Sequence, residues 1–267
     1  MSEPKGKCEP DTSEPIVGQA LDDRRAAEAF DRRNSTTSRV AALVANAGLA
    51  CQFQSILSVQ GLPFAEMALL YASIGDTPHG ESTILRATGP AQLARAGAVF
   101  RKRAAAEFAT AGIPAAVNLY LPYYCVLAGV DEIGPPLAEV LASSRLATAR
   151  VIVELLVPPT DDLVAANIEQ ACRLRSIGLA ISIRISDPDE RAERAARAIS
   201  ADFIHLVRPP RTFDEASQFK AFIAAAKKHG SRAIVGGVEG PDDATLVEGL
   251  GVTLFSGDAI ATPRFLC

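Results

Sequence analysis

The segment AISIRIS, residues 180–186, alternates isoleucine with small or polar residues. Successive side chains of a strand point to opposite faces, so the isoleucines share one face, and Ser182 and Arg184 share the other. This pattern predicts a barrel strand whose apolar face packs under helices while its polar face points toward the barrel axis. The segment thus predicts the fold and also places a cation inside the barrel.

Strand-like and helix-like segments alternate over most of the chain. Helical spacing is found near 91–111, 134–143, 161–176, 189–198, 214–229 and 241–250. Strand patterns are found at 115–121, 150–156, 179–185, 202–207, 232–237 and 252–256. This alternation predicts parallel strands that are joined by crossover helices.

Two further strands are expected before these units, at 51–59 and 64–71, with a turn at 60–63 between them. Strands joined by so short a turn are antiparallel. The total is eight strands, the number that closes a (β/α)8 barrel. The predicted fold is therefore α/β, a modified TIM (β/α)8 barrel with an antiparallel first strand, and residues 72–90 are expected to form a loop.

Length and composition favour one main domain. The chain has 267 residues, of which 48% are hydrophobic, so it can bury a large core. The net charge of -4 and the lack of a Lys/Arg block argue against a nucleic-acid polymer as partner. No apolar run approaches the ~20 residues of a membrane span. Five scattered cysteines without a CxxC pair are typical of a reducing compartment, so a cytoplasmic location is expected.

The first 35 residues are rich in Glu, Pro, Asp, Arg and Ser. Such a segment cannot bury enough apolar surface to fold alone, so it is expected to be a disordered or partly helical tail, with a short helix around 21–30. A second helix is expected at 40–47. The barrel domain is accordingly assigned to residues 36–267.

Four short motifs follow one another at the predicted strand ends. They are VNL at 117–119, VEL at 153–155, GGVEG at 236–240 and SG at 256–257. Together with the opening hairpin, they resemble the EAL-domain family, modified (β/α)8 barrels that hydrolyse cyclic di-GMP. The resemblance covers about residues 38–267.

The resemblance implies which functional positions of the family are kept here. The glutamine of the family's first strand motif corresponds to Gln54, its asparagine metal ligand to Asn118, a glutamate ligand to Glu154, and the second glutamate of its AEGVE motif to Glu239.

Other functional positions of the family are replaced. The metal-binding glutamate of the EAL motif corresponds to Met67 and the phosphate-facing arginine to Tyr71, while Glu66 is one residue away and is expected to face the other side of its strand. The remaining replacements are Val157 for a second glutamate, Arg184 and Ile185 for the aspartate pair, His205 for the catalytic lysine, Val207 for the next aspartate, Gly236 for a glutamate and Ser256 for a late glutamine.

These replacements remove the charge that the family's chemistry requires. Two divalent cations need several carboxylates, because hard cations prefer oxygen ligands and repel each other. The aligned positions offer the acid Glu154, the amide Asn118 and the added cation Arg184. The sequence therefore predicts no metal site, no cofactor and no hydrolysis, and it predicts an ion pair between Arg184 and Glu154, which lie on successive strands.

The candidate ligand-binding residues are Gln54, Asn118, Glu154, Arg184, His205 and Glu239. Several also have a purely structural interpretation. Asn118 is a candidate hydrogen-bonding residue at a strand end, and Glu154 is a candidate ion-pair partner. His205 is expected to be a satisfied residue at the barrel opening rather than a general base, because the pattern places no nucleophile near it.

Two functions follow from the resemblance. The first is a catalytically inactive EAL-like domain that acts as a regulatory protein-interaction module, with a protein partner of unknown identity, in bacterial cyclic di-GMP signalling. The alternative is a non-hydrolysing cyclic di-GMP receptor in which Tyr71, Tyr120 or Tyr123 stacks on a guanine. An enzyme of another barrel family is disfavoured, since the pattern has no inward lysine and no zinc motif. Members of the EAL family often pair, so a homodimer remains open.

Overall fold

The computed structural model describes residues 49–74, 77–81, 83–84, 90–124, 135–157 and 162–266. The predicted tail at 1–35, the helix expected at 40–47 and the domain boundary at 36 lie outside these residues. No helix within the described residues is long and apolar enough to cross a membrane.

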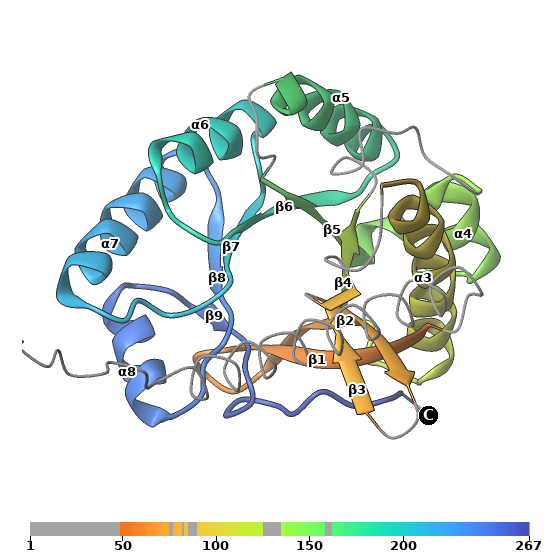
Figure 1. Ribbon diagram of the computed structural model, residues 1–267, viewed down its shortest axis with the longest axis horizontal. Coiled ribbons are helices and arrows are strands. Elements are labelled where there is room, and N and C mark those ends of the chain that lie inside the picture. Colours follow the sequence, from red (N-terminus) through yellow and green to blue (C-terminus); the bar gives the residue numbers. More distant parts are fainter. Residues whose placement is uncertain are drawn as a thin grey trace, which may run out of the picture.

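The described residues contain eight strands that close into a barrel (Figure 1). In order around the barrel they are β1 (Ala50–Ser58), β2 (Pro63–Ile74), β4 (Asn118–Tyr123), β5 (Val151–Leu156), β6 (Ala180–Ile185), β7 (Phe203–Leu206), β8 (Arg232–Val235) and β9 (Leu254–Phe255). Strand β1 is antiparallel to both of its neighbours, β2 and β9, whereas the other neighbouring barrel strands are parallel. The predicted barrel with an antiparallel first strand is thus confirmed.

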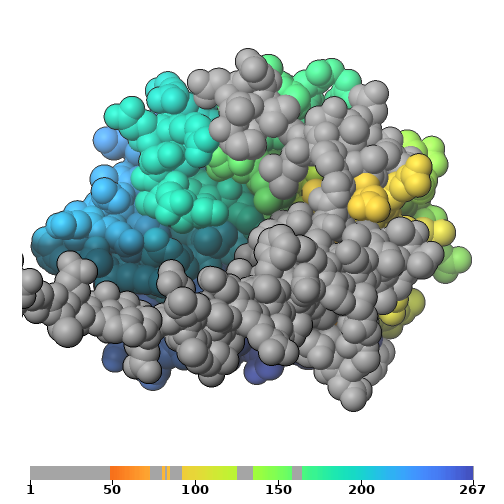
Figure 2. Space-filling view, in the orientation of Figure 1, coloured from red at the N-terminus to blue at the C-terminus, as the bar shows by residue number. Residues whose placement is uncertain are grey.

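Within the described residues, six helices lie outside the strands from β4 to β9 (Figure 1). They are α3 (Pro90–Thr110), α4 (Leu137–Ser143), α5 (Asp162–Ser176), α6 (Glu190–Ile199), α7 (Phe213–Lys228) and α8 (Pro241–Gly249). A short 3-10 helix, η2 (Thr148–Arg150), precedes β5. The atoms of α6 and α7 lie side by side at the left of the molecule (Figure 2). Each helix lies close to its expected position, and α6 and α7 each bury one apolar face.

The expected strand at 115–121 begins later than predicted. The backbone N–H of Val117 donates to the carbonyl of Pro114 at 2.9 Å, which makes a turn there, and β4 starts at Asn118. The later start leaves the alternation of side chains unchanged, so Asn118 and Tyr120 still share one face of the strand.

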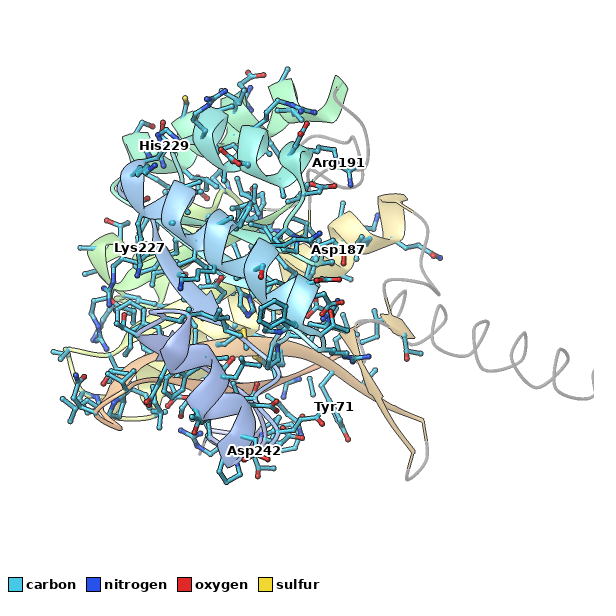
Figure 3. All side chains as sticks on the ribbon, turned by 90° about the vertical axis from the view of Figure 1, so that its left-hand side faces the viewer. Tyr71, Asp187, Arg191, Lys227, His229 and Asp242 are labelled. Carbon is cyan, nitrogen blue, oxygen red and sulfur yellow. The ribbon has the colours of Figure 1, made fainter. Side chains whose placement is uncertain are left out.

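The expected loop at 72–90 is wrong in its first part. Strand β2 continues to Ile74, and Thr77–Gly80 form an additional strand, β3, which pairs antiparallel with β2. Figure 3 shows this β2–β3 hairpin projecting beyond the barrel on the side where Asp187 and Tyr71 lie, whereas Lys227 and His229 lie on the opposite side. Because Asp187 follows β6, the hairpin lies at the carboxyl ends of the parallel strands, which we call the mouth.

The barrel separates two apolar clusters. The cluster inside the barrel consists of Ile56, Ala65, Met67, Tyr120, Ile152, Phe203, Ile234 and Leu254. The larger cluster lies between strands and helices and includes Val151, Val153 and Leu155 of β5 and the three isoleucines of β6. The alternation in the sequence therefore predicts correctly which faces of β5 and β6 point inward.

The outer face of the β1–β2 hairpin contacts the C-terminal segment, which we define as residues 258–266. Arg264 exchanges two backbone hydrogen bonds with Phe53, at 2.7 and 2.9 Å. Its side chain donates to Ser55 Oγ at 3.1 Å and lies 2.7 Å from Glu66 Oε1. Glu66 is 4% exposed, so the positive charge of Arg264 compensates a buried carboxylate. Glu66 faces the opposite side of its strand from Met67, as expected.

Replacing Arg264 tests this contact. Arg264→Ala leaves the Glu66 carboxylate buried without its cation, and because Arg264 is itself half exposed we expect a loss of about 1–3 kcal/mol in the free energy of unfolding. Urea denaturation measures this loss. Arg173→Ala is the matched control, since it removes an exposed arginine paired with Glu169, and it should change stability by less than about 0.5 kcal/mol. Equal effects of the two substitutions would contradict the assignment.

Candidate functional site

The centre of the site is Glu154, a carboxylate on β5 that is 0% exposed. Its Oε1 atom accepts a hydrogen bond from Tyr120 Oη at 2.8 Å and lies 2.5 Å from His205 Nδ1. Tyr120 Oη is also 2.7 Å from Ser182 Oγ. Strands β4, β5, β6 and β7 are successive neighbours in the barrel, so each strand contributes one polar side chain to this network.

The hydrogen bonds determine where the protons lie. Burial, together with the charge of Glu154, raises the pKa of Tyr120 well above its usual value, so its hydroxyl stays protonated and donates a hydrogen bond to Glu154. The hydroxyl of Ser182 must then donate to Tyr120 Oη, because a phenol has a single proton. His205 Nδ1 also donates to the carboxylate, and this assignment leaves Nε2 as the nitrogen that faces away from Glu154.

Arg184 on β6 lies between two carboxylates. Its Nε atom is 3.0 Å from Glu154 Oε2, in a geometry that makes the contact an ion pair rather than a hydrogen bond. Its NH1 and NH2 atoms donate to the two carboxylate oxygens of Glu81, with NH2 at 3.1 Å from Oε2. The predicted ion pair between Arg184 and Glu154 is confirmed, and Glu81 is a second partner that the sequence did not indicate.

Glu154 is held in its ionised form. Burial alone would raise its pKa, but the charges of Arg184 and His205 and the hydrogen bonds from His205 and Tyr120 outweigh burial and lower the pKa to about 2. The burial of Arg184 would likewise lower its pKa, and the carboxylates of Glu154 and Glu81 raise it well above the usual range instead. The pair therefore stays charged on both sides at neutral pH.

A cavity of about 310 Å³ opens beside this network at the mouth. Its lining consists of Gln54, Met67, Glu81, Arg184, His205, Val207, Gly236, Gly237 and Ser256. Three of these residues have a buried polar atom with no hydrogen-bond partner among the described residues, namely Arg184 Nε, which is ion-paired with Glu154, His205 Nε2 and Ser256 Oγ. A side chain at position 236 would collide with His205, since its Cβ would lie 2.8 Å from Nε2. The absence of a side chain there keeps the cavity open.

The structure brings four of the six predicted ligand-binding residues together. Glu154 and Arg184 are paired, His205 is bonded to Glu154, and Gln54 lines the same cavity while its amide donates to Asp258 Oδ1 and to the carbonyl of Ala261. Met67, Gly236 and Ser256, which the resemblance aligned with functional positions of the family, also line this cavity.

Asn118 and Glu239 lie elsewhere. Asn118 is the first residue of β4 and donates to the carbonyl of Phe64 at 3.1 Å, so it has the structural role that was one of its two interpretations. On β4, the side chain that reaches Glu154 belongs to Tyr120, two residues later. Glu239 is exposed in the turn before α8, where its backbone N–H donates to Asp243.

Two of the three tyrosines proposed for guanine stacking are inaccessible. Tyr120 is fully buried in the Glu154 network, and Tyr123 is 1% exposed beneath the guanidinium of Arg101, 4.6 Å from its ring centre. Tyr71 is partly exposed and contacts the ring of Phe265 edge-on.

The mouth does not fit a pair of divalent cations. The carboxylate oxygens of Glu154 already face Arg184, His205 and Tyr120, and the guanidinium of Arg184 adds a positive charge where two cations would have to bind. No group of three or more His, Cys, Asp or Glu side chains within the described residues could hold a metal ion. We therefore derive no metal-dependent step from this arrangement.

Comparison with known proteins identifies the fold. A scan against protein-family models and a search of curated proteins found no match. Among solved structures, the PaMucR phosphodiesterase in complex with cyclic di-GMP is 16% identical, with a TM-score of 0.66 over 85% of this chain and 95% of that one. The FimX EAL domain from Pseudomonas aeruginosa, bound to cyclic di-GMP, is 16% identical, with a TM-score of 0.69 over 83% of this chain and 93% of that one.

The YkuI protein of Bacillus subtilis, which has an EAL domain and was crystallised with cyclic di-GMP and calcium, is 11% identical. The TM-score is 0.70, and the match covers 85% of this chain but 57% of that protein. At these identities the likeness concerns the fold. The expectation of an EAL-like barrel, which the sequence motifs raised, is confirmed.

The ion pair predicts a large effect of removing its cation. Arg184→Ala leaves Glu154 buried without its main counter-charge, so we expect a loss of roughly 3–5 kcal/mol in the free energy of unfolding, measured by chemical denaturation. The double variant Glu154→Gln/Arg184→Met removes both charges and should lose less. Arg194→Ala, which removes an exposed arginine next to Glu190, is the control. A loss below about 0.5 kcal/mol for Arg184→Ala would contradict this arrangement.

The lowered pKa of Glu154 predicts how stability changes in acid. The unfolded carboxyl takes up its proton near the ordinary value of 4.5, whereas the folded one does so near pH 2. The stability that ionised Glu154 contributes is therefore fully present above about pH 4.5 and is lost as the pH falls toward 2. We expect unfolding free energies of the wild type to fall by up to about 3 kcal/mol more than those of Glu154→Gln over this range.

Glu215 has a similarly lowered pKa, because Arg208 donates to it, but it is present in both proteins and cancels in the comparison. Parallel pH profiles for the wild type and Glu154→Gln would show that Glu154 is not held ionised.

Proposed function

We propose that this chain is a non-hydrolysing EAL-type domain that takes part in cyclic di-GMP signalling as a regulatory protein-interaction module. The observation that supports this best is Arg184, a cation bound between Glu154 and Glu81 at the strand end where the sequence resemblance implies paired acids. Two-metal phosphodiester hydrolysis requires negative charge at this place to hold the ions that bind water and phosphate.

The other replaced positions support the same proposal. The residue aligned with the family's catalytic lysine is His205, whose Nδ1 is engaged by Glu154. The residue aligned with the EAL glutamate is Met67, which belongs to the apolar cluster inside the barrel. The barrel itself is closed. We therefore assign it a role that depends on its surface rather than on catalysis.

A surface for such a partner is available at the mouth. The β2–β3 hairpin projects beyond the barrel (Figure 3), and Tyr71 at this end contacts Phe265, which is 51% exposed. Exposed aromatic side chains are common at the centres of protein interfaces.

A second candidate function is a receptor that binds cyclic di-GMP without cleaving it. It is favoured by the mouth cavity, in which His205 Nε2 and Ser256 Oγ have no hydrogen-bond partner among the described residues. The structures of PaMucR, YkuI and FimX that share this fold were determined with cyclic di-GMP bound.

Incubation with cyclic di-GMP and either Mg²⁺ or Mn²⁺ tests the proposal. We expect no hydrolysis, measured by chromatography of the nucleotide, under conditions in which an active EAL phosphodiesterase consumes it. Turnover that disappears in Glu154→Gln would overturn the proposal. Calorimetric titration with the nucleotide separates the two candidates, because the absence of binding heat at large excess leaves only the protein-interaction module.

A further inference from the structure

The charged side chains of helices α6 and α7 are separated by sign. Their first turns, which follow the carboxyl ends of the strands, carry Glu190, Glu193, Asp214 and Glu215, and their last turns carry Arg197, Lys227 and Lys228. Such an arrangement suits the dipole of a helix. It also gathers positive charge at the end of the barrel opposite to the mouth, which we call the base, and Figure 3 shows Lys227 and His229 at this end.

The basic side chains at the base are neighbours in space. The guanidinium of Arg175 lies 3.5 Å from the carboxylate of Asp202, whose backbone carbonyl accepts a hydrogen bond from the N–H of Arg232 at 2.9 Å. Arg197 and His229, the residue after α7, line one small pocket. We therefore treat these cations as one surface, the basic patch, which consists of Arg175, Arg197, Lys227, Lys228 and Arg232.

Most of the charge in the basic patch is not neutralised. Arg175 is paired with Asp202, and Lys227 donates to the carbonyl of Gly251 at 2.6 Å, so these two side chains have structural contacts. The other three, Arg197, Lys228 and Arg232, are exposed, and within the described part of the chain they form no ion pair. Because the whole chain carries a net charge of -4, this positive surface is a local feature that composition does not explain.

An apolar side chain lies beside the basic patch. Leu62, in the turn between β1 and β2, is 65% exposed. Two residues later, the ring centre of Phe64 lies 4.9 Å from the guanidinium carbon of Arg232, which is also 5.6 Å from the ring centre of Phe203. The base therefore offers exposed aliphatic surface next to positive charge, while Arg232 covers one face of an aromatic ring.

This combination favours a protein over other polyanions. Single-stranded nucleic acids bind basic grooves that also present open aromatic rings for stacking, and here Arg232 covers the ring of Phe64. A membrane surface requires a broad apolar face, whereas Leu62 offers the area of one side chain. The carboxylates of a protein segment match guanidinium and ammonium groups, and an apolar residue of the same segment can contact Leu62.

We propose that the basic patch is a docking surface for an acidic segment of a partner protein. The carboxylates of this segment face Arg197, Lys228 and Arg232, and an apolar side chain of the segment packs on Leu62. The inference rests on the proposed function as a protein-interaction module, to which it adds the chemistry of one partner and the place where it binds. The base lies at the other end of the barrel from the mouth, so this surface is separate from the aromatic one described above.

Fluorescence anisotropy with a labelled peptide, made of glutamates and one central leucine, tests the inference on the full chain at low ionic strength. We expect binding that weakens as salt is added, because exposed charges are screened. The variant Arg197→Gln/Lys228→Gln/Arg232→Gln removes the positive charges without an ion-pair partner. It should bind the peptide at least about tenfold more weakly than the wild type does, equivalent to about 1.4 kcal/mol.

The matched control removes the same number of exposed cations outside the basic patch. It is Arg95→Gln/Lys102→Gln/Arg211→Gln, which changes the net charge equally and should bind the peptide as the wild type does. Leu62→Ser should weaken the binding of this peptide and leave the binding of an all-glutamate peptide unchanged.

Circular dichroism verifies that each variant is folded. If the patch variant is unfolded because Arg232 no longer packs on Phe64, the double variant Arg197→Gln/Lys228→Gln should shift the affinity in the same direction.

Equal losses in the two triple variants would overturn the inference, as would a wild type that does not bind the peptide at low salt. Tighter binding of a single-stranded oligonucleotide or of phosphatidylserine vesicles, lost in the patch variant, would overturn the choice of a protein partner. Hydrolysis of cyclic di-GMP is measured separately, so a peptide that fails to bind leaves the proposed lack of hydrolysis standing. Turnover by a chain that does bind the peptide would instead overturn the proposed function alone.

Discussion

The arrangement at the mouth depends on a carboxylate that has no contact with solvent. An isolated charge in the interior would cost several kcal/mol, and Glu154 is tolerated because a cation, a phenol and an imidazole surround it. Each of these partners lies on a different strand, so the compensation links β4, β5, β6 and β7. The packing of these four strands inside the barrel therefore depends on the compensation of the charge of Glu154.

The same network explains how the fold tolerates the cation of Arg184 inside the barrel. The outer faces of the strands are apolar and pack under the helices, and this packing does not depend on the inward side chains at the mouth. The guanidinium of Arg184 supplies a positive charge beside Glu154 at a fixed position and, unlike a metal ion, has no ligands that exchange. The interior is thus satisfied by residues of the chain itself.

Much of the fold was predictable because its signals are local. Alternating apolar residues marked the barrel strands and their inward faces, and the count of eight with a short first turn predicted closure with one antiparallel strand. The pair of Glu154 and Arg184 was predictable too, since residues on the inward faces of successive parallel strands become neighbours.

The errors arose where the position of a residue depends on distant parts of the chain. On β4 the side chain that bonds to Glu154 is Tyr120, while Asn118 at the start of the strand bonds to the carbonyl of Phe64. Glu81 follows a strand that exists only through its pairing with β2.

The proximity of Ser256 to His205 was also missed, and it is a property of the closed barrel. Their strands are separated by β8, and Gly236, at the end of β8, leaves the space between them free of a side chain. The two side chains do not hydrogen-bond to each other, so the expectation that His205 is no general base stays a prediction.

The contact of Arg264 with Glu66 constrains the order in which the molecule can assemble. The two residues are 198 positions apart, and Gln54 bonds to Asp258 over 204 positions. During synthesis the β1–β2 hairpin emerges from the ribosome about 200 residues before the groups that complete its hydrogen bonds. Contacts of such large sequence separation slow folding, so the hairpin and its acid reach their final packing only after residues 258–264 have been translated.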